Sequence, residues 1–195
     1  ITVIGRRMLR IPAHPRYARM LIEAEQFGCV REVALMAALV SGRDLLMRVS
    51  PRDERDRIIR RNRESLLKRR ENTSDYFLYA NSYNFAVGNN FDGKQCFNHG
   101  INAHVAREVS QTLEQLLSIV EEAGLTLEAE PLPGPALAES LARCHLVGFI
   151  DHLAVRTGSG SAEYDMARGH RGTLADESVV GAHTLIVASD IREVG

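Results

Sequence analysis

Apolar residues recur at helical spacing through the first 150 residues of the chain, and this periodicity limits the fold more than any other feature. The first stripe, with a period of about 3.6 residues, is formed by Tyr17, Met20, Leu21, Ala24 and Phe27. Pro15 can open such a helix at its first turn, and Gly28 can end it. Residues 30–41 are apolar on most faces and precede Gly42, which predicts a buried central helix.

A very different helix is predicted over residues 51–71, starting at Ser50-Pro51. Of the 20 residues 52–71, 14 are charged, and the clearly apolar ones are Ile58, Ile59, Leu66 and Leu67. Acid-to-base pairs four residues apart support an exposed helix; they are Asp53/Arg57, Asp56/Arg60 and Glu64/Lys68. The segment therefore predicts an exposed arm with a thin buried seam.

Three further helices complete the helical part. Ser74 can cap an aromatic helix that runs to about residue 87, and a loop rich in Gly and Asn follows. Asn102 can cap a helix ending at Gly124, whose apolar stripe is Val105, Val109, Leu113, Leu116 and Val120. Residues 131–135, rich in Pro, form the one clear boundary, and residues 136–148 predict a short helix.

Beyond residue 148 the pattern changes to short strands joined by Gly-rich turns. The expected strands are 149–156, 162–168, 172–175 and 183–191. Such a series indicates a small β-barrel, complete or partial. The fold class is therefore α+β and mainly α, with a helical bundle followed by a small β-module.

Composition excludes several classes of protein. The chain has 195 residues, 45% hydrophobic and 25% charged, so it can bury a core and is not disordered. The three cysteines have no CxxC spacing, which favours a reducing, cytoplasmic location. The longest apolar run, residues 33–40, is well short of the roughly 20 residues that cross a bilayer, so no membrane partner is expected. A start at Ile1 without Met suggests an excised fragment.

No motif indicates catalysis or metal binding. Residues 88–95 nearly match the phosphate loop GxxxxGK[ST], but Gln95 has no hydroxyl for magnesium and the preceding segment predicts a helix rather than a strand. An ordinary loop between helices is the better interpretation. Cys96, His99 and His104 match no zinc spacing, and a buried thiol with two loop histidines is favoured. His145 and His152 are expected to be structural.

The arginines are the remaining signal. All basic residues except Lys68 and Lys94 are arginine, and residues 1–74 hold 17 Lys+Arg against 9 Asp+Glu, whereas residues 75–195 hold 7 against 16. Guanidinium groups bind phosphates and stack on bases, so the basic half indicates a polyanionic partner. A solvated charged surface is the alternative, favoured for the arm. In the β-module, Arg156, Arg168 and Arg171 lie on or beside strands, with Phe149 and Tyr164 as the only aromatic candidates.

At several places, in order along nearly the whole chain, the sequence resembles the DEAH-box RNA helicases. Residues 4–22, IGRRMLRIPAHPRYARMLI, resemble the Gly-Arg-x-Met…Pro-x-x-Pro-x-x-x-x-Met-Leu segment between the winged-helix and ratchet domains. Gly28-Cys29, Ser74-Asp75-Tyr76-Phe77 and the segment 100–109 continue the pattern. Residues 141–149, 162–167 and 183–191 are similar to the approach to the OB-like domain and its strands. The bacterial branch is the closer match, and the arm at 51–71 departs from the family.

The resemblance implies a C-terminal helicase-associated region: the end of a winged-helix-like segment at 1–14, a helical domain at 15–148 and an OB-like module at 149–195. The RecA-like motor domains, which use ATP and Mg²⁺, would precede Ile1, and no cofactor is expected in this chain. The expected partners are single-stranded RNA, those motor domains and a regulatory protein. The candidate RNA-binding residues are Arg10, Arg16, Arg107, Arg156, Arg168 and Arg171.

The predicted function is that of a non-catalytic accessory region of an ATP-dependent RNA helicase, which contacts the RNA backbone and supports unwinding. A protein–protein adaptor, in which the arginines only solubilise the chain, is the alternative. An independent enzyme is the least favoured, because no catalytic signature is present.

Overall fold

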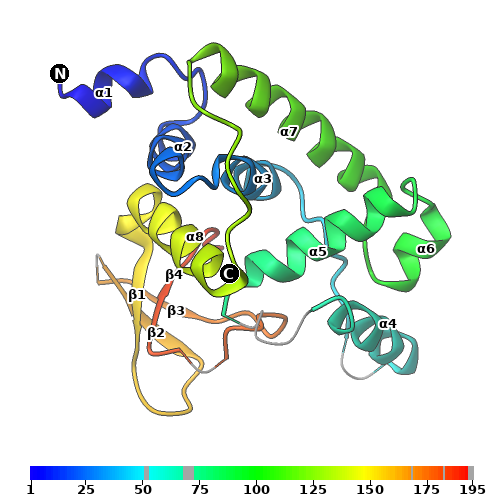
Figure 1. Ribbon diagram of the computed structural model, residues 1–195. Coiled ribbons are helices and arrows are strands. Elements are labelled where there is room, and N and C mark those ends of the chain that lie inside the picture. Colours follow the sequence, from blue (N-terminus) through cyan, green and yellow to red (C-terminus); the bar gives the residue numbers. More distant parts are fainter. Residues whose placement is uncertain (51–52, 68–72, 168, 182, 193–195) are drawn as a thin grey trace. The chain divides into compact units, whose positions relative to one another are not determined.

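The structure is a computed structural model that describes residues 1–50, 53–67, 73–167, 169–181 and 183–192. Within these residues it is mainly helical, with a small antiparallel sheet near the carboxyl end, which confirms the predicted fold class (Figure 1). The packing forms two compact units. The first comprises residues 1–34 and 116–195, and the second comprises residues 35–115. The predicted division into residues 1–14, 15–148 and 149–195 stays a prediction.

The first unit is built around two helices that pack against each other, α2 (Pro15–Phe27) and α8 (Gly134–Gly148). Their contact is close, because a Cβ placed on Gly148 would lie 2.5 Å from Cγ of Met20. As predicted, Pro15 stands in the first turn of α2, and Gly28 ends the helix in the left-handed conformation at φ +65°. A short helix, α1 (Val3–Met8), precedes them and packs on α2.

A four-stranded sheet completes this unit (Figure 1). Its strands are β1 (Leu153–Arg156), β2 (Glu163–Met166), β3 (Arg171–Thr173) and β4 (Leu185–Val187), in the order β3-β2-β1-β4 with antiparallel neighbours. All four lie within or beside the predicted strands but are shorter. The first begins four residues later than expected, since residues 150–152 form the 3₁₀ turn η1 (Ile150–His152) after the buried Phe149.

The second unit contains α4 (Glu54–Glu64), α5 (Asp75–Gly88) and α6 (Gly93–Asn98). Two further helices begin in one unit and end in the other; they are α3 (Val30–Ser41) and α7 (Ala103–Glu122). Asn102 caps α7 as predicted, because its side-chain oxygen accepts from the backbone N–H groups of His104 and Val105. The expected loop at 88–101 is in part wrong, since α6 forms there with Asp92 as its N-cap.

The charged helix is shorter than the predicted 51–71. Asp53 is its N-cap and Ser65 its C-cap, and the expected end at residue 71 lies outside the described residues. The ion pairs also differ from those expected. Arg57 pairs with Glu54 rather than with Asp53, and Arg60 lies 2.9 Å from Glu64. The carboxylate of Asp56 accepts instead from the backbone N–H of Ser50 at 2.6 Å.

Candidate nucleic-acid interface

Arg16, one of the predicted RNA-binding residues, is held inside the first unit. Its two terminal nitrogens lie 2.5 and 2.8 Å from the two carboxylate oxygens of Asp151, and it also donates to the carbonyl of Gly148 at 3.0 Å. The guanidinium stands 4.9 Å above the ring of Phe149. Arg16 holds the pKa of the Asp151 carboxyl well below its usual range. This geometry connects α2 to the turn before β1.

The structure places Arg156 and Arg171 on opposite faces of the sheet. Arg156 is paired across the strands with Tyr164, whereas Arg171 is paired with Asp165, one position further along the same strand. Successive side chains of a strand point to opposite faces. The two arginines therefore do not share one binding surface, and the third candidate of this module, Arg168, lies outside the described residues.

Both described candidate arginines of the β-module, Arg156 and Arg171, bind protein groups. Arg156 donates to the hydroxyl of Tyr164 at 2.7 Å and to the carbonyl of Gly181 at 2.6 Å. Arg171 is more exposed, and its Nε lies 2.9 Å from the carboxylate of Asp165. The two aromatic candidates, Phe149 and Tyr164, are 4% and 2% exposed, so neither offers a free ring to a base.

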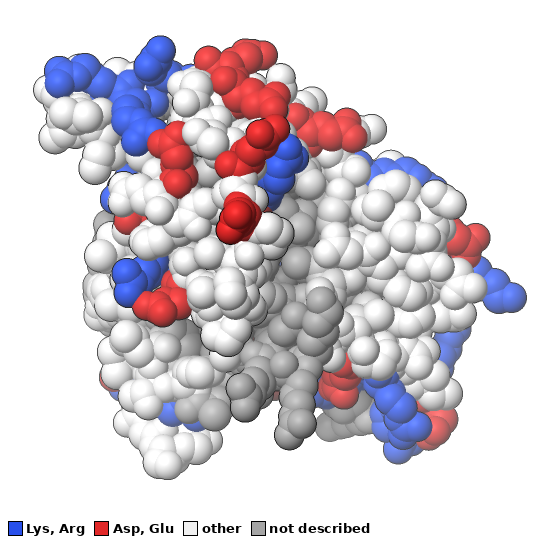
Figure 2. Space-filling view, viewed as in Figure 1, with Lys and Arg blue, Asp and Glu red and all other residues white. Residues whose placement is uncertain are grey.

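The other two predicted residues lie in different units. Arg10 is exposed just after α1. In this region Figure 2 shows basic side chains around α1 and, beside them, acidic side chains over the carboxyl end of α7. Arg107 is exposed near the start of α7. Its guanidinium lies 5.3 Å from the centre of the Phe91 ring, and it donates to the carbonyl of Phe91 at 3.0 Å. The predicted residues are thus dispersed rather than gathered in one cluster.

Two arginines of α4 have roles that the sequence did not indicate. Arg63, within the helix expected to be a solvated face, is 4% exposed and donates to the carbonyls of Met47, His99 and Gly100. Arg55 is exposed and lies 4.7 Å from the centre of the Phe97 ring. Arg55 and Phe97 are 42 positions apart in the sequence, so no local pattern could have pointed to this contact.

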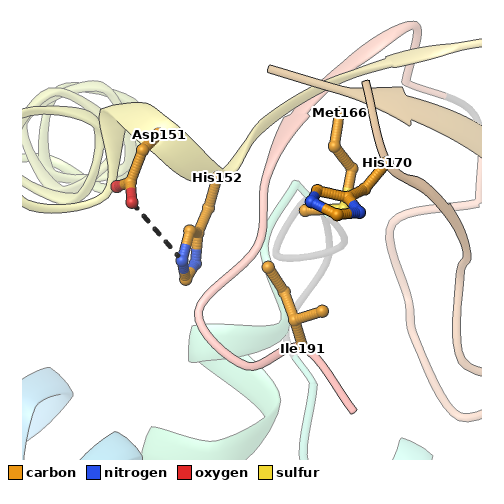
Figure 3. A pocket seen from close by; sticks show the side chains of 5 residues that line it. All are labelled: Asp151, His152, Met166, His170 and Ile191. Atoms are coloured by element: carbon orange, nitrogen blue, oxygen red, sulfur yellow. Dashed lines mark ion pairs between the residues drawn. The ribbon is translucent and has the colours of Figure 1, made fainter. Parts of the chain in front are cut away.

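A small pocket lies beside the sheet, lined by Asp151, His152, Met166, His170 and Ile191 (Figure 3). The two imidazoles face it from different elements, and His152 is oriented by a 3.0 Å contact of Nδ1 with the carbonyl of Ala188. The volume of the pocket, about 180 Å³, is below the usual 300–1,000 Å³ of ligand sites. The titratable side chains of the lining are Asp151, whose carboxylate is bound by Arg16, and the two histidines His152 and His170.

The residues weighed as metal ligands serve separate purposes. Cys96 is buried, and burial raises the pKa of its thiol. The ring of His99 stacks on Phe85, with 4.1 Å between ring centres, and His104 lies 3.4 Å from Glu108. Over the described ranges, no three His, Cys, Asp or Glu side chains are grouped to hold a metal. None of the helices described here is long and apolar enough to cross a membrane.

The segment that nearly matches a phosphate loop joins two helices, α5 and α6. A phosphate loop follows a strand, so this geometry differs from that motif. Asn90 and Phe91 adopt the left-handed conformation here, at φ +50° and +55°. The sequence-based preference for an ordinary connection is therefore consistent with the structure, apart from the short helix α6.

Comparison with known proteins shows which proteins this chain is similar to. Residues 14–79 match the model of the helicase associated domain (HA2), ratchet-like. The chain is 27% identical over 177 residues to the ATP-dependent RNA helicase HrpA of Escherichia coli, which covers 88% of this chain and 13% of that protein. It is 26% identical over 154 residues to the probable ATP-dependent RNA helicase DHX35 of Homo sapiens, covering 77% of this chain and 20% of that protein.

A similar relation holds for the ATP-dependent RNA helicase DHX33 of Drosophila melanogaster, with 24% identity over 155 residues, 80% of this chain and 21% of that protein. The chain thus spans about a fifth or less of the length of these relatives. The family match includes α2, α3 and α4, and the similarity to the relatives extends over most of the chain. Residues 14–79 thus resemble the ratchet-like helicase associated domain, and most of the chain is similar to parts of proteins named as ATP-dependent RNA helicases.

Proposed function

We propose that this chain contacts the backbone of single-stranded RNA as a non-catalytic region of an ATP-dependent RNA helicase. The observation that carries the proposal is its similarity, over most of its length, to proteins named as RNA helicases. In this proposal motor domains of the same protein bind ATP and Mg²⁺ in the cytoplasm. The present chain holds the strand while the motors move.

The distribution of charge supports RNA contact by the second unit. Residues 35–115 contain 13 Lys+Arg against 10 Asp+Glu, whereas the rest of the chain contains 11 against 15. Several arginines of this unit are exposed and have no ion pair among the described residues; they are Arg48, Arg55, Arg61 and Arg107. Exposed guanidinium groups bind phosphate oxygens without reading the base sequence.

The test is binding of the whole chain to labelled single-stranded RNA at low and moderate salt. We expect binding that falls steeply between about 50 and 200 mM salt, with similar affinity for unrelated sequences, because phosphate contacts release counterions. Absence of binding even at the lower salt concentration would reject autonomous RNA contact. ATP hydrolysis by this chain alone would contradict its non-catalytic assignment.

A second candidate function, protein docking, is favoured by the surface of α1. Large apolar side chains are exposed on and beside this helix; they are Ile1 (88%), Val3 (68%), Ile4 (41%) and Leu9 (76%). Such a patch is typical of a protein interface. The expected partners are the motor domains or a regulatory protein, and a pull-down that survives nuclease treatment and is lost in Leu9→Ser would support this role.

A further inference from the structure

Two stacks of arginine on phenylalanine lie at the short helix α6, one just before it and one on it. Arg107 of α7 lies over Phe91, just before α6, and Arg55 of α4 lies over Phe97, within it. Both arginines are exposed, and both rings are partly exposed. Neither guanidinium has an ion pair among the residues described, unlike Arg57 and Arg60, which pair with glutamates on α4 itself. The two stacks therefore keep their positive charge available.

The first stack is held in place by its backbone. Phe91 and the preceding Asn90 both have positive φ, which is unfavourable for residues with a Cβ. The backbone N–H of Phe91 donates to the carbonyl of Ala86 at 2.7 Å, and its own carbonyl accepts from Arg107 at 3.0 Å. Ring and guanidinium are thus fixed to each other before any ligand binds. Strained backbone of this kind tends to cluster at functional sites.

The second stack is fixed through α6 and α4. Asp92 caps α6 by accepting from the backbone N–H of Gln95 at 2.8 Å, and the buried Cys96 anchors the helix. On α4, the buried Ile59 lies one turn after Arg55, and Asn62 donates to the carbonyl of Asn98 at 2.9 Å. Arg55 and Phe97 therefore meet through rigid elements and not through mobile side chains alone.

We infer that these two stacks are platforms for unpaired nucleobases of single-stranded RNA, an inference that rests on the proposed function. A base stacks on an arginine plane or an aromatic ring whatever its identity, and the arginines add attraction for the adjacent phosphates. Lys94, which lies between Phe91 and Phe97 in the sequence, is exposed on α6 and supplies a further positive charge. In Figure 2 basic side chains project from the edge that carries α4 and α6.

The dimensions suit neighbouring nucleotides of one strand. The helix α6 between Phe91 and the end of the second stack has six residues and is about 9 Å long, a length of about two or three nucleotides at 3.4 Å each. The sheet of the β-module offers no comparable platform in its described part, because Phe149 and Tyr164 are buried and Arg156 is bound to protein oxygens. The platforms thus place base contacts in the second unit and not on the sheet where the sequence had suggested them.

The test compares the affinity of the whole chain for two labelled probes, an oligoadenylate of about 12 nucleotides and an abasic strand of the same length. Arg55→Lys and Arg107→Lys keep the charge but lose the planar guanidinium. We expect each to weaken oligoadenylate binding by about 5- to 100-fold and to leave abasic binding nearly unchanged. Arg57→Lys and Arg60→Lys are the matched controls on α4 and should bind both probes like the parent chain.

The outcomes separate this inference from the function on which it rests. If the parent chain binds oligoadenylate but the two lysine variants bind it equally well, the two stacks do not act as base platforms, whereas the proposed RNA contact is retained. Equal loss for both probes would also reject stacking, because it would show a phosphate contact alone. If the parent chain binds neither probe at low salt, both the proposed function and the platforms are overturned. Circular dichroism of each variant verifies that it is folded.

Discussion

Arg63 is a charged side chain that has become part of the core of the second unit. Its guanidinium donates to the carbonyls of Met47 at 2.8 Å, Gly100 at 2.9 Å and His99 at 3.3 Å. Gly100 has φ +63°, and a Cβ there would lie 2.2 Å from the arginine Nη2. A residue with a side chain could not occupy this position without displacing Arg63. The guanidinium therefore joins α4 to the segment between α3 and α4 and to the segment after α6.

Replacing Arg63 should destabilise the second unit. Arg63→Met removes the donor from three carbonyls, and we expect a loss of about 2–4 kcal/mol in the free energy of unfolding, measured by urea denaturation. Arg61→Met, on the exposed side of the same helix, should change it by less than about 0.5 kcal/mol. Equal effects of the two substitutions would show that Arg63 is not a structural donor.

His145 gives the stability of the first unit a dependence on pH. Burial and the nearby His152 lower the pKa of its imidazole from 6.5 to about 4, and Ser189 lies 3.0 Å from its Nε2. Because the unfolded chain binds the proton more tightly, stability should fall as pH falls from about 6.5 to about 4, by at most about 3 kcal/mol.

The matched variant His145→Gln keeps a polar group near Ser189 but does not titrate. Its free energy of unfolding should change less with pH than that of the parent chain over the same pH interval. Asp151 acts in a lower range, because Arg16 lowers its pKa and its contribution is lost as pH falls from the ordinary carboxyl range towards that lowered pKa. Parallel pH curves for the two proteins would contradict the assignment to His145.

At the scale of elements, Arg16 connects α2 to the turn η1 through both oxygens of Asp151. Lysine cannot make this two-point contact or stack on Phe149, so Arg16→Lys should lower stability by about 1–2 kcal/mol. Arg19→Lys is the control, since Arg19 makes one contact with Glu23 within its own helix. Thermal unfolding measures the stability of both variants relative to the parent chain.

The same pair of variants bears on the predicted RNA role of Arg16. If its charge attracts phosphates, Arg16→Lys should bind RNA with nearly the parent affinity while being less stable. A large loss of affinity without a loss of stability would instead indicate that the guanidinium reaches the RNA and does not bind Asp151 in solution.

Local signals predicted the elements well because they act within a few residues. Pro15, Gly28, Asn102 and the apolar stripes placed α2, α3, α7 and α8 within about two residues of their observed bounds. The environment of the arginines could not be predicted in this way. Arg16 meets a residue 135 positions away, and Arg63 binds carbonyls up to 37 positions away. Only the fold decides which arginines are buried and which stay exposed.

At the scale of the whole molecule, the net charge is −1, so no general attraction draws RNA to this chain. Binding must come from local groups, and the salt dependence of the affinity shows how many phosphates these groups neutralise. Single strands give a slope of log K against log salt of about −0.7 for each phosphate neutralised. If Arg55, Lys94 and Arg107 each meet one phosphate, the slope should be about −2.

Lys94 provides the sharpest check on this count, because it is exposed on α6 and carries no predicted structural role. Lys94→Gln should make the slope shallower by about 0.7, whereas Arg43→Gln should leave it unchanged, since Arg43 already pairs with Glu108 at 2.7 Å. Titrations of the parent chain and both variants against the same oligoadenylate measure the three slopes. A steep slope that neither substitution alters would place the phosphate contacts elsewhere, on arginines such as Arg6 of α1 and Arg10 just after it, and would move the RNA to the first unit.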